Sequence, residues 1–311
     1  KLKVLFIMNP ISGTTSKDGI APLIDKYIDS SKFDCQIRVT EYAGHAEQLA
    51  RQAVADGGDG TVNEVGRAIV HSHTALGIIP CGSGNGLARH LMIPINIRKA
   101  LEIINLCQIR PLDYGVINGY PFFVLVEWVS TLVSVTSLPK LAITYVQKVL
   151  EEGLKYQPET YEICDENGTA TYKAFLVSCA NASQYGNNCY IAPQASMSDG
   201  LMDVIIMEPF DLLEAPQISI DMFNKTLDQS SKIKTFRTKH LHIHRSKPGM
   251  IHFDGDPVMT DADVEVTLQE KGINIVVNPY ADRSKRKPNA FQSAAAQIFN
   301  EINIVRDDLS K

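Results

Sequence analysis

Three glycine-bearing stretches near the start of the chain could bind phosphate. One of them, GGDGTVNE (residues 57–64), has glycines that let backbone N–H groups approach an anion closely. A helix beginning there would offer its positive N-terminus to the same anion. Asp59 would repel a bare phosphate, so it fits a metal-bound water or a ribose hydroxyl better; the alternative is a tight turn that caps a helix. The nucleotide-binding candidates in this stretch are Gly57, Gly58, Asp59, Gly60, Thr61 and Asn63.

Two further loops follow predicted strands. NPISG comes after the apolar residues 4–8, where Asn9 could bind a base or ribose and Ser12 a phosphate. PCGSGNGLARHL comes after residues 75–80 and supplies the candidates Gly82, Ser83 and Gly84. Parallel strands present their carboxyl ends at one edge of a sheet, where α/β proteins bind nucleotides. We therefore expect the three loops to form one nucleotide site; Arg89 would contact phosphate or form a salt bridge.

Two acidic turns occur in the second half of the chain. SMSDGLMD (residues 196–203) contains Asp199 and Asp203, and hard oxygen ligands of this kind suit Mg²⁺. HFDGDP places Asp254 and Asp256 on either side of a glycine. A general base must reach the hydroxyl that it deprotonates, and either of these carboxylates could do so. The alternative readings are a plain turn and an acidic hairpin turn.

The elements expected to carry the loops alternate between strands and helices, which predicts an α/β domain over residues 1–113. GGDGT follows helix-like residues directly, without the buried strand that usually precedes a phosphate loop, so we hypothesise that a short strand is absent from this sequence. The helices predicted in this domain span residues 20–30, 45–55, 62–70 and 98–105, and a further strand spans residues 36–40.

The sequence changes character near residue 112. Stretches rich in β-branched residues, separated by Asn-Gly or Gly turns, predict a mainly antiparallel β domain over residues 114–278, with a hairpin turn at 165–168. Residues 279–311 form a C-terminal segment. Apolar residues at helical spacing predict a helix over 289–307 that packs on the N-terminal domain.

Composition narrows the classes of function. The 311 residues carry a net charge of −5, which argues against a nucleic-acid partner. Six scattered cysteines with no CxxC pair favour a reduced, cytoplasmic compartment. No apolar run approaches the roughly 18 residues of a membrane span. A lipid substrate would therefore have to be reached by transient contact with the membrane surface. Nothing in the sequence indicates the oligomeric state.

The motifs NPISG, GGDGTVNE and PCGSGNGLARHL, followed by NNCYIAPQASMSDGLMDV and HFDGDP, resemble the diacylglycerol kinase catalytic family. The likeness is greatest to the soluble bacterial lipid kinases, which are related to the sphingosine and ceramide kinases. It implies a nucleotide-binding α/β domain, a C-terminal β-sandwich and an active site in the cleft between them. It also implies a structural magnesium site at Ser196, Asp199 and the carbonyl of Leu201. Asp256 stands where the family pattern has glutamate, as a base or a magnesium ligand.

Together these features predict a lipid kinase that depends on ATP and Mg²⁺ and phosphorylates a diacylglycerol-like hydroxyl. The catalytic candidates are Asp256, Asp254 and Asp59, and Asp203 joins the predicted metal ligands. No Walker A lysine motif is present, which disfavours P-loop chemistry. Two alternatives stay open: an NAD kinase-like enzyme, which shares GGDGT, and a non-catalytic protein that binds nucleotide or lipid.

Overall fold

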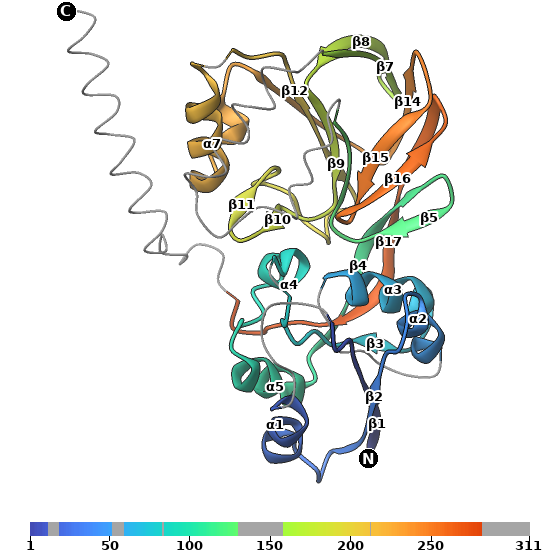
Figure 1. Ribbon diagram of the computed structural model, residues 1–311, viewed down its shortest axis with the longest axis vertical. Coiled ribbons are helices and arrows are strands. Elements are labelled where there is room, and N and C mark those ends of the chain that lie inside the picture. Colours follow the sequence, from blue (N-terminus) through green and yellow to red (C-terminus); the bar gives the residue numbers. More distant parts are fainter. Residues whose placement is uncertain (12–18, 52–58, 83, 130–157, 212, 282–311) are drawn as a thin grey trace, which may run out of the picture.

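The computed structural model describes residues 1–11, 19–51, 59–82, 84–129, 158–211 and 213–281. An N-terminal α/β domain lies below a C-terminal domain of mainly antiparallel strands (Figure 1). This is the fold class that the sequence predicts. The helix expected at 289–307 lies outside the described residues.

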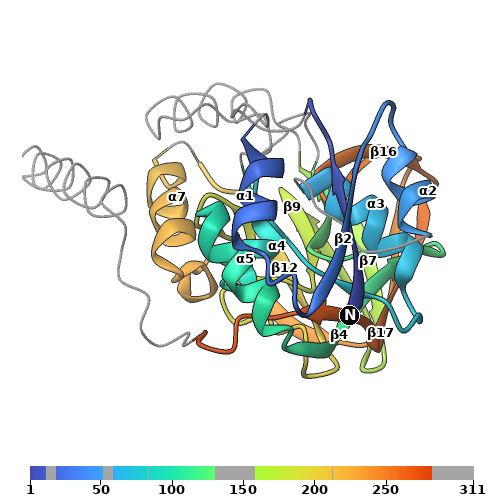
Figure 2. The same ribbon diagram turned by 90° about the horizontal axis from the view of Figure 1, so that it is seen from below.

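The N-terminal domain is built around β1 (Leu2–Met8), which pairs in parallel with β2 (Phe33–Val39). The apolar run of β1 is buried on both faces, as is typical of a parallel strand. Phe6 contributes to a core cluster with helices α1 and α5, and Ile7 to another with α2 and α3. Seen from below, the two helix pairs lie on opposite sides of β1 and β2 (Figure 2). The helices of this domain are α1 (Ile20–Tyr27), α2 (His45–Ala50), α3 (Asp59–Ile69), α4 (Gly86–His90) and α5 (Ile97–Leu106).

The third strand, β3 (Ala75–Leu76), pairs in parallel with β17 (Asp263–Val276), and no pairing of β3 with β1 is found among the described residues. Ile78 and Ile79 nevertheless divide between the same two core clusters as β1, as successive residues of a strand would. The hypothesis that a strand is missing from the sequence before Gly57 concerns the neighbourhood of residues 52–58, which lie outside the described part of the chain.

The C-terminal domain consists of two large sheets that enclose a core around Trp128, Tyr161 and Phe122. One sheet has the order β13-β12-β9-β6-β15-β16, the other β5-β4-β17-β14-β7-β8. The expected hairpin turn is confirmed, since β7 and β8 are joined with Asp165 opposite Gly168. The remaining elements are β4 (Ile109–Ile117), β5 (Tyr120–Phe122), β6 (Leu125–Val129), β7 (Glu159–Asp165), β8 (Gly168–Ala174), β9 (Leu176–Ala180), β10 (Gln184–Gly186), β11 (Cys189–Tyr190), β12 (Met202–Met207), α7 (Ala215–Asn224), η2 (Leu227–Gln229), β13 (Ile233–Thr238), β14 (His240–Arg245), β15 (Gly249–Phe253) and β16 (Asp256–Thr260).

The two domains share a strand. β17 pairs with β4 and β14 in the sandwich, and its last residues continue into the N-terminal domain, where Ile275 lies opposite Leu76. Its register with β4 shifts between Gln269 and Ile273. The buried carboxylate of Asp113 accepts the N–H of Lys271 at 2.8 Å within this irregularity. The domains are thus joined by one strand, whose pairing is irregular between Gln269 and Ile273.

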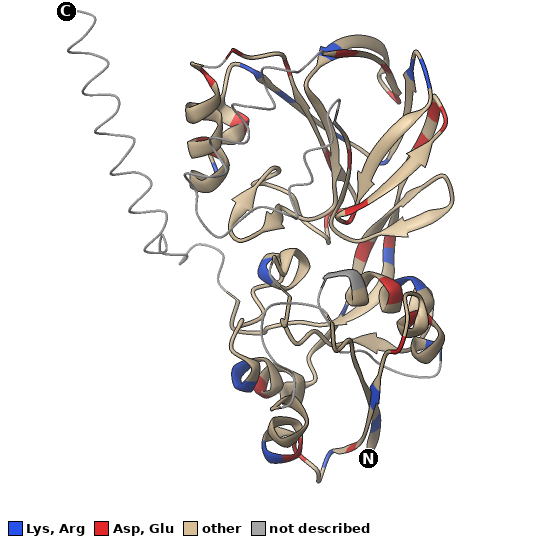
Figure 3. Cartoon of the chain, viewed as in Figure 1, with Lys and Arg blue, Asp and Glu red and all other residues tan. Residues whose placement is uncertain are grey.

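Lys and Arg, as well as Asp and Glu, occur along the chain in both domains (Figure 3). All six cysteines are free thiols. Among the described residues, no helix has the length and apolar character needed to cross a membrane.

We predict that Gly66→Ala destabilises the protein, although alanine usually favours a helix. A Cβ at Gly66 on α3 would lie 2.6 Å from the ring of Phe123, which is fully buried where α3 meets the sandwich. Overpacking of this kind costs about 1–3 kcal/mol of unfolding free energy, measured by urea denaturation. Gly19→Ala is the matched control, because no atom lies within 4 Å of its added Cβ. Equal stability of the two variants would contradict this packing.

Candidate active site

The loops after β1 and β2 meet at the carboxyl edge of their sheet. Asn9 follows β1, and its side-chain oxygen accepts the N–H of Ile11 at 3.0 Å. Thr40, which follows β2, is buried and donates its N–H to the carbonyl of Met8 at 2.8 Å. Thr40 therefore lies beside the strand end that carries Asn9, a position that our sequence analysis missed. The available signal was a hydroxyl side chain at the last position of the strand predicted over residues 36–40.

Helix α3 begins at Asp59, three residues before the predicted start at residue 62. Thr61 and Asn63 are buried rather than open to a ligand. Glu64 faces the loop after β2 and accepts the N–H of Gly44 at 3.2 Å. Four predicted site residues, Ser12, Gly57, Gly58 and Ser83, lie outside the described residues.

The loop Gly82–Gly86, here called the GSGNG loop, is closed by its own asparagine. The Asn85 side chain accepts the Gly82 N–H at 2.9 Å and donates to the Gly82 carbonyl at 2.7 Å. Asn85 itself has a left-handed backbone with φ of 54°. Arg89 donates from Nε to the Gly84 carbonyl at 2.9 Å, so at least one of its donors supports the loop. These hydrogen bonds tie Gly82 to Asn85 and Gly84 to Arg89, and nucleotide binding by the two glycines stays a prediction.

The turn Asp254–Asp256 joins β15 to β16, and its two carboxylates differ in environment. Asp254 accepts three successive backbone N–H groups, from Phe123 at 2.9 Å, Val124 at 2.8 Å and Leu125 at 3.2 Å. Burial raises the pKa of Asp254 to about 6, opposed by these hydrogen bonds and by the charge of Arg67. Asp256 is exposed. Asp254 thus holds the turn, and Asp256 is the carboxylate that a substrate could reach.

This turn also contacts the N-terminal domain. Asn63 of α3 donates from Nδ2 to the carbonyl of Asp254 at 3.4 Å. One helical turn further, the guanidinium of Arg67 lies 4.5 Å from the centre of the Phe253 ring and donates to the carbonyl of Pro121 at 3.1 Å. The structure therefore brings the GGDGTVNE and HFDGDP motifs together across the domain boundary.

The segment predicted to hold a structural metal, residues 196–203, contacts a positively charged side chain from another part of the chain. Arg237 on β13 donates from Nε to Asp203 at 3.2 Å, and from Nη2 to the Gln194 carbonyl at 3.2 Å. The same Nη2 lies 3.2 Å from a carboxylate oxygen of Asp199. Asp203 and Arg237 are direct partners across β12 and β13.

These contacts leave Asp199 and Asp203 with a guanidinium where a metal was expected. Ser196 instead shares a hydrogen bond with Ser198 at 3.3 Å, and Leu201 donates its N–H to Asp199 at 3.3 Å. In the part of the chain that the structure describes, no group of three His, Cys, Asp or Glu side chains is arranged to hold a metal ion. This arrangement does not fit a metal.

Comparisons with known proteins agree with the motifs and the fold. Residues 3–117 match the model of the diacylglycerol kinase catalytic domain, and residues 127–277 match that of the YegS C-terminal NAD kinase beta sandwich-like domain. The chain therefore combines a diacylglycerol kinase catalytic domain with a YegS-type C-terminal domain. The family expected from the motifs is thereby confirmed.

Several relatives cover most of the chain. A protein named diacylglycerol kinase from Bacillus subtilis is 28% identical over 274 residues, which are 80% of this chain and 88% of the relative. A "Probable lipid kinase YegS-like" protein from Chromohalobacter salexigens is 26% identical and covers 71% of this chain and 77% of its own length.

Solved structures share the fold. A diacylglycerol kinase structure from Bacillus anthracis superposes with a TM-score of 0.70 at 22% identity, covering 89% of this chain and 97% of that one. An NAD kinase from Archaeoglobus fulgidus has a TM-score of 0.52 at 12% identity, covering 89% and 94%. At such identities the likeness concerns the fold alone.

We predict that the turn around Asp199 is stabilised by Arg237 and not by a metal. Arg237→Met should lower the unfolding free energy by about 1–2 kcal/mol, because it leaves Asp203, whose side chain is only 12% exposed, without its cation. The wild-type urea midpoint should not respond to EDTA or MgCl₂. The variant should gain stability from MgCl₂, because its two carboxylates are then free to bind a cation.

The matched control is Arg98→Ala, which removes an exposed helical ion pair with Glu102 at 3.0 Å. Such a pair contributes at most about 0.5 kcal/mol. A wild-type midpoint that rises with MgCl₂ as much as that of Arg237→Met would show the assignment to be wrong.

Proposed function

We propose that this protein is a lipid kinase that uses ATP and Mg²⁺ to phosphorylate the hydroxyl of a diacylglycerol-like lipid. The observation that carries the proposal is the contact between Asn63 and the carbonyl of Asp254, at 3.4 Å. Asn63 belongs to the helix that follows the phosphate-loop motif, and Asp254 to the turn that presents Asp256. Phosphate donor and proton acceptor would therefore face one another across the domain boundary.

The proposed reaction is an in-line phosphoryl transfer. The lipid oxygen forms a bond to the γ-phosphorus of ATP while the bond from that phosphorus to the β,γ-bridging oxygen breaks, which releases ADP. The hydroxyl proton passes to the carboxylate of Asp256. Backbone N–H groups of Gly57–Gly60 and of the GSGNG loop would hold the phosphates, with Asn9 near the ribose or base. Asp254 would keep the turn in place, because its oxygens are occupied by backbone donors.

Magnesium would enter with the nucleotide. Hard carboxylate oxygens suit this ion, and we assign it to Asp59, which leaves Asp256 to accept the proton. When bound, it neutralises charge that develops on the phosphate oxygens. This assignment is separate from the segment of Asp199 and Asp203, where Arg237 already supplies the positive charge.

We further propose that the protein works in the cytoplasm and reaches its lipid by transient, peripheral contact with a membrane. The free state of all six cysteines supports a reducing compartment. A lipid acceptor supports the membrane contact, because such molecules reside in bilayers.

The test is transfer of radiolabelled γ-phosphate from ATP to a panel of diacylglycerol, phosphatidylglycerol, ceramide and NAD. Wild type should label a lipid in the presence of Mg²⁺. Asp256→Ala should lower kcat by about 10²- to 10⁴-fold, the usual contribution of a general base. Asp59→Ala should lower kcat by a similar factor. Asp261→Ala, which removes an exposed carboxylate just beyond β16, is the matched control and should retain activity.

Labelling of NAD alone would assign the chain to the NAD kinase reaction instead. ATP binding without transfer to any acceptor would indicate a non-catalytic binding protein. Equal lipid labelling by wild type, Asp59→Ala and Asp256→Ala would overturn the residue assignments while leaving the reaction intact.

A further inference from the structure

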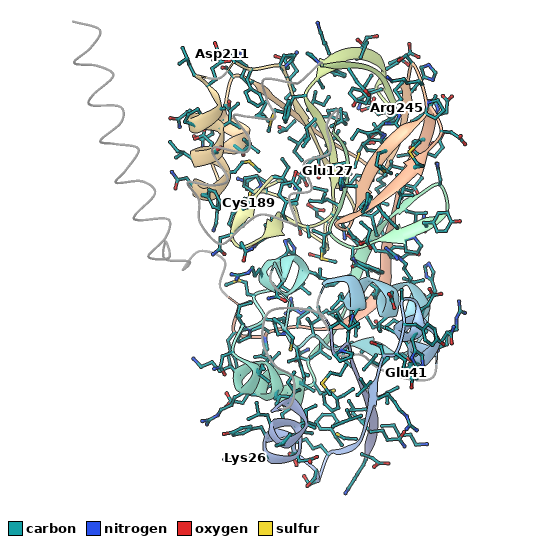
Figure 4. All side chains as sticks on the ribbon, viewed as in Figure 1. Lys26, Glu41, Glu127, Cys189, Asp211 and Arg245 are labelled. Atoms are coloured by element: carbon teal, nitrogen blue, oxygen red, sulfur yellow. The ribbon has the colours of Figure 1, made fainter. Side chains whose placement is uncertain are left out.

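A buried acid, Glu127, lies on β6 in a run of otherwise apolar residues. Its neighbours across the sheet are Ser178 on β9 and His252 on β15. Its carboxylate accepts a hydrogen bond of 2.5 Å from the hydroxyl of Tyr185 on β10. Glu127 and Cys189, both labelled in Figure 4, belong to the C-terminal domain above the nucleotide loops. The reaction proposed above gives Glu127 no role.

Tyr185 connects this acid to the nucleotide loops. Its strand β10 lies directly against the GSGNG loop, since Asn85 forms a β-bridge with Gly186 and Asn187 donates its N–H to the Gly84 carbonyl at 3.2 Å. The backbones of β10 and the GSGNG loop lie so close together that no side chain would fit between them at Gly86. A Cβ at Gly86 would lie 2.8 Å from the carbonyl oxygen of Tyr185.

A second contact joins helix α4 to the segment just before β10. The buried ring of His90 on α4 lies 3.0 Å from the Ser183 hydroxyl, and its Nδ1 accepts the Ser183 N–H, also at 3.0 Å. The segment that carries Tyr185 is therefore pinned to both the GSGNG loop and the helix that follows it. A displacement of Tyr185 would be transmitted to the loop.

We propose that Glu127 is a positioning residue for the nucleotide: through Tyr185, its carboxylate holds β10 against the GSGNG loop and so fixes the backbone N–H groups that bind phosphate. This inference rests on the nucleotide site of the proposed function. A hydrogen bond to an ionised acceptor is roughly twice as strong as one between neutral groups. The ionised form of Glu127 therefore holds Tyr185 more firmly than the protonated form does.

The ionisation of Glu127 falls in the physiological range. Burial raises its pKa to about 7, and the hydrogen bond from Tyr185 opposes the rise. The titratable groups that face it within the described residues are Tyr185, His252 and Cys189. Burial lowers the pKa of His252 and raises that of Cys189 to about 12, so both are uncharged near neutral pH. Glu127 is therefore the group of this cluster that changes charge as pH crosses 7.

The test is calorimetric titration of the full chain with MgATP, without lipid, from pH 6 to pH 8.5. Glu127→Gln keeps the size and an acceptor oxygen but cannot ionise. At pH 8 it should bind MgATP about five- to tenfold more weakly than wild type, which corresponds to a loss of about one net hydrogen bond. At pH 6 the two proteins should bind alike. The ratio of their dissociation constants cancels the ionisation of ATP itself.

Tyr185→Phe should show the same loss at pH 8, and it tests the inference independently if Glu127→Gln folds poorly. The matched controls are Glu159→Gln and Tyr161→Phe, because Tyr161 donates to Glu159 at 3.3 Å elsewhere in the sandwich. Both controls should follow wild type at every pH.

Parallel pH profiles for wild type, Glu127→Gln and Tyr185→Phe would overturn the inference. Failure of wild type to bind MgATP would overturn it together with the nucleotide site. The expected pH-dependent difference in a protein that labels no lipid would support the positioning role while refuting the lipid kinase reaction.

Discussion

Three consecutive backbone N–H groups, at residues 123–125, lie where the two domains meet, and the first two fall between β5 and β6. Buried donors of this kind need acceptors, because an unpaired one costs free energy comparable to a lost hydrogen bond. One carboxylate, that of Asp254, accepts all three. The arrangement buries a charge, which is why the pKa of Asp254 rises to about 6. In return it fixes the start of β6, the turn that presents Asp256, and the carbonyl that meets α3.

The features that follow from local sequence were predictable. The apolar run 4–8, the helical spacing near residues 20 and 98 and the turn at 165–168 appear as a strand, helices and a hairpin, because each is decided by neighbours in the chain. That the three glycine-bearing loops form one nucleotide site stays a prediction, because residues 12–18 and 52–58 lie outside the described part of the chain. The family could also be inferred, since the order of its motifs is a property of the sequence.

Features set by long-range register were not predictable. The association of Asp203 with Arg237 depends on how β12 aligns with β13, and residues between them give no sign of it. The two carboxylates of residues 199–203 indicate that a cation binds there, but they do not distinguish a metal ion from the guanidinium of Arg237. The burial of Asn63 and the use of Asp254 as a backbone acceptor arise only when the domains pack together. Local sequence therefore predicted that these residues belong to the site, but not which groups they contact.

The strand β17 has a mechanical consequence. Because it is hydrogen-bonded to β4 over most of its length and also to β3, the domains cannot separate as rigid bodies on a free hinge without breaking a sheet. Motion between them must be accommodated where the ladder is already interrupted, between Gln269 and Ile273, by bending or twisting of the strand. Such a flexure is shared by every contact between the domains. Their relative motion is therefore a bend or twist of the shared strand and not a wide opening.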